Sequence, residues 1–471
     1  MRLIRFRLHL ILIMSFSILL FTVSCGINND LHQNNLQTTV RITESDLNEK
    51  AIRSSQKLPT EKNSYSSTTV FSDKSSIVNF TSGLTQKTIE NHSISMKKNE
   101  EERGIWIYFS ELNFKDKSEK GFKNEIDKMF NNVKNNKFNT IYVHVRPFGD
   151  SFYPSKIFPW SSYISGQQGK SPGYDPLKYM VESAHKLGLK FNAWLNPFRV
   201  STTSNDIKTL SENNPARKIL SDSNLSNDHW VRLSGNGIYY NPAVPEIQKM
   251  IIDGIKEIVS NYDVDGIHFD DYFYPTKSEN FDEIAYLNYK KAVTGKALSL
   301  YDWRRVQVSA FVSGTYRAIK AINKSVEFSI SPHANFSNNY NNLFADVNTW
   351  ISSCGYIDKI IPQIYFGFEY PGPLIDGQSF EFDKCAKLWS EKVSSSVKLS
   401  FGLGLYKAGT EQKVGEKTSK EWIRNTDMMK RQIEFIRQFK NNSGIVVFSY
   451  SQLTSSDHNK KEVENMISVF N

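Results

Sequence analysis

The chain contains eight short segments rich in β-branched and aromatic residues, and segments with helical character separate them. The eight are GIWIYFS (104–110), NTIYVHVRP (139–147), KFNAWLNPF (190–198), VDGIHFDDY (264–272), EFSISPHAN (327–335), DKIIPQIYF (358–366), VKLSFGLGLY (397–406) and SGIVVFSYS (443–451). Strands that alternate with helices form a parallel sheet. Eight such units predict a closed (β/α)8 barrel, or TIM barrel, of the α/β class.

Two of the intervening segments have the apolar periodicity of amphipathic helices. DPLKYMVESAHKLGL (175–189) places apolar residues on one face and ends at Gly188, and PEIQKMIIDGIKEIVSNY (245–262) repeats the pattern. An open, doubly wound sheet is the alternative architecture. No glycine-rich phosphate loop follows the first strand, which argues against its dinucleotide-binding form, and we expect no cofactor.

The first hundred residues differ from the rest. Residues 1–25 contain three arginines, then an apolar run, then small residues, which is typical of a secretory signal peptide, with a membrane anchor helix as the alternative. Residues 26–100 are rich in Ser, Thr, Asn and Lys without any apolar period, so we expect a disordered linker. The predicted domains are therefore 1–25, 26–100 and the barrel over 101–471.

Cys25 ends the predicted signal peptide. Val23 and Ser24 precede it and Gly26 follows, which resembles the lipobox of bacterial lipoproteins, although Thr22 stands where leucine is usual. The resemblance implies that Cys25 is lipidated. It also implies an extracytoplasmic protein held at the cell membrane by its N-terminal lipid.

Charge and cysteine content limit the partners. The formal charge falls from +9 to +6 once the three signal-peptide arginines are removed, and a mild excess over this length is no signature of nucleic-acid binding. It suits work beside an anionic cell wall or membrane. Cys354 and Cys385 have no metal-site spacing, and the sequence leaves open whether they form a disulfide.

Side chains of a β-strand alternate between its two faces. In GIHFDD, Ile267 and Phe269 share one face, and His268 and Asp270 share the other. Barrel helices favour apolar partners, so Ile267 and Phe269 are expected to face outward. Asp270 is then predicted to point into the barrel mouth, at the carboxyl end of its strand, where active sites of this fold are built.

The same alternation predicts a polar cluster at the mouth. Its expected members are His144, Arg146, Asp150, Asn196, Arg199, His268, Asp270, Asp271, His333, Gln363, Tyr365 and Glu369. The aromatic residues expected around them are Trp106, Tyr108, Phe148, Tyr153, Trp160, Trp194, Tyr272 and Tyr274. Sugars present CH faces for stacking and hydroxyls for hydrogen bonds, so this combination predicts a carbohydrate substrate.

Glycoside hydrolysis commonly uses two carboxyl groups, about 5 to 5.5 Å apart for retention or about 6.5 to 9.5 Å apart for inversion. Asp270 is the candidate nucleophile or base, because an inward Arg146 or His268 would keep it ionised. The structural alternative for Asp270 is an ion pair with Arg146.

The proton donor stays open at this stage. Glu369, just past the sixth strand, and Asp271 are the first candidates, and Glu111 and Asp150 compete with them. The residues expected to bind or orient the substrate are His144, Arg146, Asp150, Trp194, Asn196, Arg199, His268, His333, Gln363 and Tyr365.

Seven segments, in this order, carry a family resemblance: RGIWIYFSELNF (103–114), NTIYVHVRPFGDSFYPS (139–155), FNAWLNPFR (191–199), YYNPAVPEI (239–247), DGIHFDDYFYP (265–275), SISP (329–332) and PQIYF (362–366). They resemble the bacterial glycosyl-hydrolase-like family ten, also known as domain of unknown function 187, over about residues 101–406. The resemblance implies a (β/α)8 glycosidase of the cell envelope that hydrolyses O-glycosidic bonds in a polysaccharide, with peptidoglycan glycan strands as the expected substrate.

DGIHFD is also similar to the fourth-strand motif of the alpha-amylase clan, whose last Asp is the nucleophile, and this implies that role for Asp270. That clan has a glutamate acid after its fifth strand. Here SISPHANF offers His333 and no carboxylate. The identity of the acid and the stereochemical outcome therefore stay open.

Two other functions compete. A metal-dependent polysaccharide deacetylase would hold one ion with His144, His268, His333 and Asp270, since His and Asp are ordinary zinc ligands, although the motif spacing of known metal barrels is missing. A barrel that binds wall glycan without catalysis is favoured by the missing fifth-strand carboxylate.

Overall fold

The computed structural model describes residues 100–470. The predicted signal peptide, the lipidation site at Cys25 and nearly all of the predicted linker lie outside the described residues. Within 100–470, no helix is both long enough and apolar enough to cross a membrane. Cys354 is an exposed free thiol and Cys385 a buried one.

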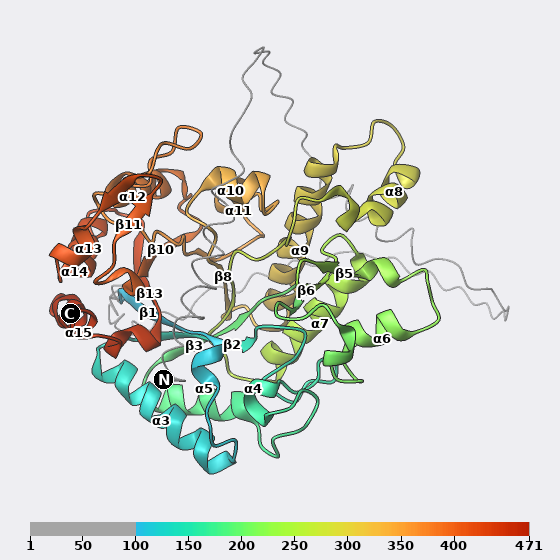
Figure 1. Ribbon diagram of the computed structural model, residues 1–471, viewed down its shortest axis with the longest axis horizontal. Coiled ribbons are helices and arrows are strands. Elements are labelled where there is room, and N and C mark those ends of the chain that lie inside the picture. Colours follow the sequence, from blue (N-terminus) through green and yellow to red (C-terminus); the bar gives the residue numbers. More distant parts are fainter. Residues whose placement is uncertain (1–99, 471) are drawn as a thin grey trace, which may run out of the picture. The chain divides into compact units, whose positions relative to one another are not determined.

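Eight parallel strands close into a barrel, and helices surround it (Figure 1). The strands are β1 (Glu102–Ile107), β2 (Thr140–Arg146), β3 (Lys190–Leu195), β7 (Gly266–Phe269), β8 (Glu327–Ile330), β9 (Lys359–Ile360), β10 (Lys398–Gly404) and β13 (Asn442–Phe448). Around the barrel their order is β1-β13-β10-β9-β8-β7-β3-β2. Each corresponds to one of the eight predicted segments, so the predicted (β/α)8 barrel is confirmed.

The α-helices follow the expected alternation with the strands. They are α3 (Glu119–Asn135), α4 (Ser162–Ser165), α5 (Pro176–Lys186), α6 (Pro215–Ser221), α7 (Pro245–Asn261), α8 (Glu283–Ala292), α9 (Leu300–Ile322), α10 (Phe336–Asn341), α11 (Val347–Ser352), α12 (Phe382–Lys392), α13 (Glu421–Arg424), α14 (Met428–Ile436) and α15 (Asp457–Ile467). Both predicted amphipathic helices are present, as α5 and α7. Each begins with a proline in its first turn, where the missing N–H costs nothing.

Smaller elements fill the connections. The 3-10 helices are η1 (Phe109–Leu112), η2 (Ile207–Thr209), η3 (Asp228–Trp230), η4 (Glu279–Phe281), η5 (Leu405–Lys407) and η6 (Tyr450–Thr454). Between β3 and β7 the chain forms a small antiparallel sheet of β4 (Arg199–Ser201), β5 (Val231–Ser234) and β6 (Gly237–Tyr240), and after β10 a hairpin of β11 (Gln412–Val414) and β12 (Lys417–Ser419). These additions were not predicted.

The sixth barrel strand is shorter than predicted. The ladder of β9 covers only Lys359–Ile360, because Pro362 follows and has no N–H to donate. Beyond this proline Gln363 forms isolated bridges with His333 and Gly402, so the chain stays in the barrel wall and brings Gln363 to the mouth.

The barrel separates two apolar layers, as the alternation of side chains predicts. Ile267 and Phe269 of β7 face outward, and the Phe269 ring stacks on Phe311 of α9 at a centroid distance of 5.8 Å. Trp106, Tyr142, Trp194, Ile361 and Val446 form a separate cluster inside. Two glycines make room for it: a Cβ at Gly266 would lie 2.1 Å from the Asn192 amide oxygen, and one at Gly402 would lie 2.9 Å from a carbonyl oxygen.

The predicted alternation fails at the end of β2. The pairing of β2 with β3 shifts between His144 and Arg146, and Arg146 pairs with the outward-facing Leu195. A bulge of this kind inserts one extra residue and reverses the face of the next side chain. Arg146 therefore lies on the helix side of the sheet, fully buried, and its predicted inward orientation is wrong.

The amino-terminal end of the barrel, which we call the barrel floor, is held by buried charges. Lys359 pairs with Glu102 at 3.0 Å and with Glu327 at 2.5 Å, and Lys398 bonds Glu327 at 2.7 Å. Tyr142 also donates to Glu102, at 2.6 Å. Burial raises the pKa of Glu327, but Lys359 and Lys398 outweigh it and bring the pKa to about 2.

Candidate active site

Asp270 follows β7 directly and is 95% buried at the barrel mouth. The next backbone N–H, that of Tyr272, donates to its Oδ1 at 3.2 Å. Burial raises the pKa of this carboxyl, Arg199 lowers it and Asp271 raises it, with a result of about 7. Asp270 is therefore a carboxylic acid over much of the neutral range, and the cation beside it is Arg199 rather than the predicted Arg146.

Asp271 turns to the other side of β7. Its Oδ1 accepts a hydrogen bond at 3.3 Å from Nε2 of Gln363, which also donates to the Ser331 carbonyl at 2.9 Å. Its charge opposes the burial that lowers the pKa of His333. The barrel order is β9-β8-β7-β3, so Asp270 leans toward β3 and Asp271 toward β8 and β9. The two adjacent carboxyls thus diverge to either side of β7.

Asn196, at the end of β3, is oriented by His144. The backbone N–H of Phe109 donates to Nδ1 of His144 at 3.3 Å, so the ring proton lies on Nε2 and is donated to Oδ1 of Asn196 at 2.7 Å. Within hydrogen-bond distance and geometry, the amide nitrogen of Asn196 has no partner among the described residues. The Asn196 side chain lies near Asp270 and lowers the pKa of its carboxyl. His144 itself is buried, and its ring stacks on Trp194.

His268 lies below Asp270 inside the barrel. Nε1 of Trp106 donates to its Nε2 at 3.1 Å, which puts the ring proton on Nδ1, bonded to Ser329 Oγ at 2.8 Å. Burial keeps the pKa of His268 well below its usual range. His268 and Trp194 are therefore buried supports of the site, and the structure shows neither of them open to a substrate.

The metal site that the alternative deacetylase function would need is not assembled among the described residues. His144 and His268 each use both ring nitrogens for the hydrogen bonds just described. Within residues 100–470 no three His, Cys, Asp or Glu side chains come together as a metal site would require. The donor geometry therefore does not fit the ion that the deacetylase hypothesis needs.

Arg146 and Asp150 form a buried cluster behind the mouth. Arg146 donates to the carbonyl oxygens of Phe148 (3.4 Å) and Pro197 (3.2 Å) and lies over the ring of Phe158. Gln168 donates to Asp150 at 3.0 Å, and burial raises the pKa of Asp150 to about 6. By bonding the carbonyl next to Asn196, Arg146 positions the loop after β3 from the helix side of the sheet.

Two of the candidate acids are already bonded to other protein groups. Glu369 is 57% exposed at the side chain and pairs with Arg424. Glu111 accepts hydrogen bonds from Tyr108 N–H, Ser449 Oγ and Ser451 N–H. Neither residue is among the groups that act on the Asp270 carboxyl. Glu369 remains a prediction as proton donor, and its position does not favour the role.

A group of half-buried aromatic side chains forms the other half of the mouth. It comprises Tyr108, Tyr365, Tyr406 and Phe448, which follow β1, β9 and β10 or end β13, and we call it the aromatic arc. The ring centroids lie 5.7 to 6.1 Å apart for Tyr108–Phe448, Tyr365–Tyr406, Tyr365–Phe448 and Tyr406–Phe448. On the Asp270 side, Tyr272 is 46% exposed and stacks on the Arg199 guanidinium.

Sequence reasoning missed part of this arc. Tyr406 and Phe448 were not among the predicted aromatics, although the alternation of Ile445, Val446 and Val447 places Phe448 on the inner face. Conversely, Trp106, Tyr153 and Tyr274 are buried and cannot stack on a sugar.

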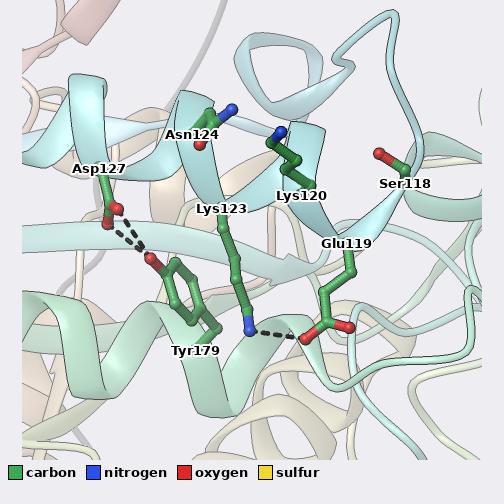
Figure 2. A pocket seen from close by; sticks show the side chains of 7 residues that line it. All are labelled: Ser118, Glu119, Lys120, Lys123, Asn124, Asp127 and Tyr179. Atoms are coloured by element: carbon green, nitrogen blue, oxygen red, sulfur yellow. Dashed lines mark hydrogen bonds and ion pairs between the residues drawn. The ribbon is translucent and has the colours of Figure 1, made fainter.

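A separate depression lies on the outer surface of the barrel, between α3 and α5 (Figure 2). It is lined by Ser118, Glu119, Lys120, Lys123, Asn124, Asp127 and Tyr179. Its polar groups already bond one another: Tyr179 donates to Asp127 at 2.8 Å, and Lys123 pairs with Glu119 at 2.6 Å. It shares no residue with the mouth.

Comparison with known proteins fits this geometry. Residues 101–423 match the family model described as Glycosyl hydrolase-like 10. The chain belongs to this family. It is 36% identical over 316 residues to the protein named glycosyl hydrolase YngK of Bacillus subtilis, a match over 63% of this chain and 58% of YngK. It is 31% identical over 348 residues to glycosyl hydrolase DigH of Escherichia coli K12, over 70% of this chain and 74% of DigH.

Among solved structures, the chain is similar in fold to the glycoside hydrolase domain of PgaB (BpsB) from Bordetella bronchiseptica. The TM-score is 0.50 at 11% sequence identity, over 78% of this chain and 98% of that domain. The family predicted from the sequence motifs is confirmed.

Proposed function

We propose that this protein is a glycoside hydrolase that cleaves O-glycosidic bonds in a polysaccharide, with glycan strands of the cell wall as the substrate, and that Asp270 transfers the proton. The observation that carries this proposal is the buried Asp270 at the mouth, with a pKa of about 7 and with Arg199 and Asn196 beside it. A proton donor works best when its pKa lies near the working pH. Family membership supports the reaction type.

The roles differ from those that the motif suggested. With Asp270 protonated, the carboxyl donates to the departing glycosidic oxygen and, once ionised, takes a proton from the attacking water. Arg199 and Asn196 favour the ionised form that follows the first transfer, because both lower the pKa of Asp270. The aromatic arc supplies apolar faces for the sugar ring, opposite the acid pair.

The proposed place of action is the outer side of the cell membrane, with the N-terminal lipid on Cys25 as the anchor. This proposal depends on residues 1–25, whose sequence carries the lipobox resemblance. Loss of membrane attachment in a Cys25→Ser protein, with unchanged activity of the released chain, is the expected result.

The direct test is Asp270→Asn. Asparagine keeps the shape but cannot donate an acidic proton, so release of reducing ends from purified wall glycan should fall by roughly 10²- to 10⁴-fold. Circular dichroism should show an unchanged fold. Full activity in this variant would refute the assignment, whereas tight glycan binding without turnover by the unmodified protein would favour the non-catalytic barrel.

A further inference from the structure

Among the described residues, Asp271 is the one carboxylate whose charge acts on Asp270, and its Oδ1 is bonded to Gln363 on the other side of β7. A retaining glycosidase places a nucleophile about 5 to 5.5 Å from the acid, and an inverting one places a base about 6.5 to 9.5 Å away. Among the described residues, Glu111 is held by three hydrogen bonds, Asp150 lies in the Arg146 cluster, and Glu369 pairs with Arg424 at the surface. Only Asp271 lies beside Asp270, as the next residue in the chain.

The Asp271 carboxylate is positioned to accept a hydrogen bond from an N–H group. It is half-buried, and its Oδ1 accepts a hydrogen bond from Gln363. Gln363 is in turn anchored on the Ser331 carbonyl. The half-buried His333 ring lies within the influence of the Asp271 charge, so the acceptor is bordered by groups from β7, β8 and β9.

Tyr365 connects this acceptor with the aromatic arc. The charges of Asp271 and Asp270 both act on its hydroxyl, so it lies close to the acid pair. Burial raises the pKa of Tyr365 well above its usual range, and the hydroxyl stays a hydrogen-bond donor. A carboxylate acceptor, a nearby phenolic donor and the rings of the aromatic arc provide partners for the N–H, the C=O and the methyl group of an acetamide.

We propose that the nucleophile is the substrate's own 2-acetamido group and that Asp271 accepts the hydrogen bond of its N–H. This inference rests on the proposed function and names its substrate class: β-linked 2-acetamido-2-deoxyhexosides, in which the acetamido group is trans to the departing oxygen. Some glycosidases are known to use the substrate in this way.

The reaction balances in two steps. The acetamido carbonyl oxygen attacks the anomeric carbon, the bond from that carbon to the glycosidic oxygen breaks, and the departing oxygen takes the proton of Asp270. This leaves a cyclic oxazolinium ion, whose N–H is bonded to Asp271. A water molecule then attacks the anomeric carbon and gives its proton to Asp270, the bond to the acetamido oxygen breaks, and the sugar is released with retained configuration.

The experiment uses the mature chain and aryl β-glycosides or short oligosaccharides of 2-acetamido-2-deoxyglucose with one, two or three fluorine atoms on the acetyl group. Fluorine withdraws electrons from the carbonyl oxygen, so kcat/KM should fall steadily, by at least ~10-fold from acetyl to trifluoroacetyl. The first-formed product, observed by NMR, should be the β anomer.

The matched variants are Asp271→Asn and Asp263→Asn. Both remove one negative charge, but Asp263 precedes β7 at the opposite end of the barrel and its side chain is 92% exposed. Asp271→Asn should lower kcat by at least ~10² and weaken binding of a bicyclic thiazoline analogue of the oxazolinium ion, because the N–H acceptor is lost. Asp263→Asn should change neither.

The outcomes separate the two proposals. Hydrolysis with no response to fluorination, or with inversion at the anomeric carbon, overturns the participation of the acetamido group and leaves the glycosidase intact. Absence of hydrolysis of every glycan, together with no binding of the thiazoline, overturns both proposals. An unfolded Asp271→Asn variant leaves the fluorine series and the anomer of the unmodified protein as the deciding measurements.

Discussion

The two ends of the barrel differ in how their charged side chains are arranged. At the floor, Lys359 has carboxylates on both sides, Glu102 also accepts from Ser400 at 2.6 Å, and each charge has a partner. At the mouth, Asp270 and Asp271 are neighbours of the same sign, and the Asn196 amide nitrogen is left without a partner among the described residues. The comparison shows that opposite charges are paired at the floor, whereas like charges lie side by side at the mouth, where active sites of this fold are built.

The largest effect should come from breaking the floor. Lys359→Met leaves two buried carboxylates without their shared cation, which should lower the free energy of unfolding by about 3–5 kcal/mol. Urea denaturation measures this change. Lys398→Met is the control, because Lys398 is 57% exposed and its loss should cost less than about 1 kcal/mol. Equal stability of the two variants would contradict the comparison.

The charge pairs of the barrel floor should also determine how the free energy of unfolding changes at low pH. The folded pKa of Glu327 is about 2, below the ordinary value of 4.5, so its contribution to stability is complete above about pH 4.5 and is lost as the pH falls toward 2. The linked change is of order 3 kcal/mol. Urea midpoints between pH 5 and pH 2.5 should therefore fall less steeply for Glu327→Gln than for the unmodified chain. Parallel curves would show that Glu327 is not the group responsible.

The mouth should respond to pH in catalysis rather than in stability. If protonated Asp270 is the acid, kcat/KM falls as the pH rises through about 7. Asp271→Asn removes a charge that raises the pKa of Asp270. The fall of kcat/KM at high pH, which is the alkaline limb of the pH profile, should therefore move to lower pH. Arg199→Gln removes a charge that lowers this pKa, so the limb should move to higher pH.

Each of these two variants is expected to move the alkaline limb by about one pH unit. Arg199→Lys keeps the charge and should leave the limb near its original position. Shifts of the same sign in Asp271→Asn and Arg199→Gln would show that another group controls the limb.

The smallest effect should come from the aromatic arc. Phe448→Ala removes one stacking face opposite the acid pair, which should raise KM roughly fivefold, or about 1 kcal/mol, with little change in kcat. Phe448→Tyr retains the ring and serves as the control. A loss confined to kcat would mean that the arc acts on the reacting bond rather than on the sugar ring.

The sequence predicts the fold better than it predicts the site. Regular alternation places Ile267 and Phe269 outward and Asp270 at the mouth, and all three predictions are confirmed. The alternation fails at Arg146, because a single inserted residue in β2 reverses the face and the sequence contains no mark of the bulge. Glu369 looked suitable by its distance from the sixth strand, but the loop carries it to the surface beside Arg424.

The sequence by itself determined the barrel, its eight strands and the delivery of Asp270 to one end, because these follow from local periodicity that any eight-unit parallel barrel must satisfy. The tertiary structure decided the chemistry of that carboxyl. Its burial, the approach of Arg199 from the sheet after β3, and the turn of Asp271 toward Gln363 are contacts between residues far apart in the chain. Electrostatic energies depend on distance and exposure in space, and no local pattern encodes either.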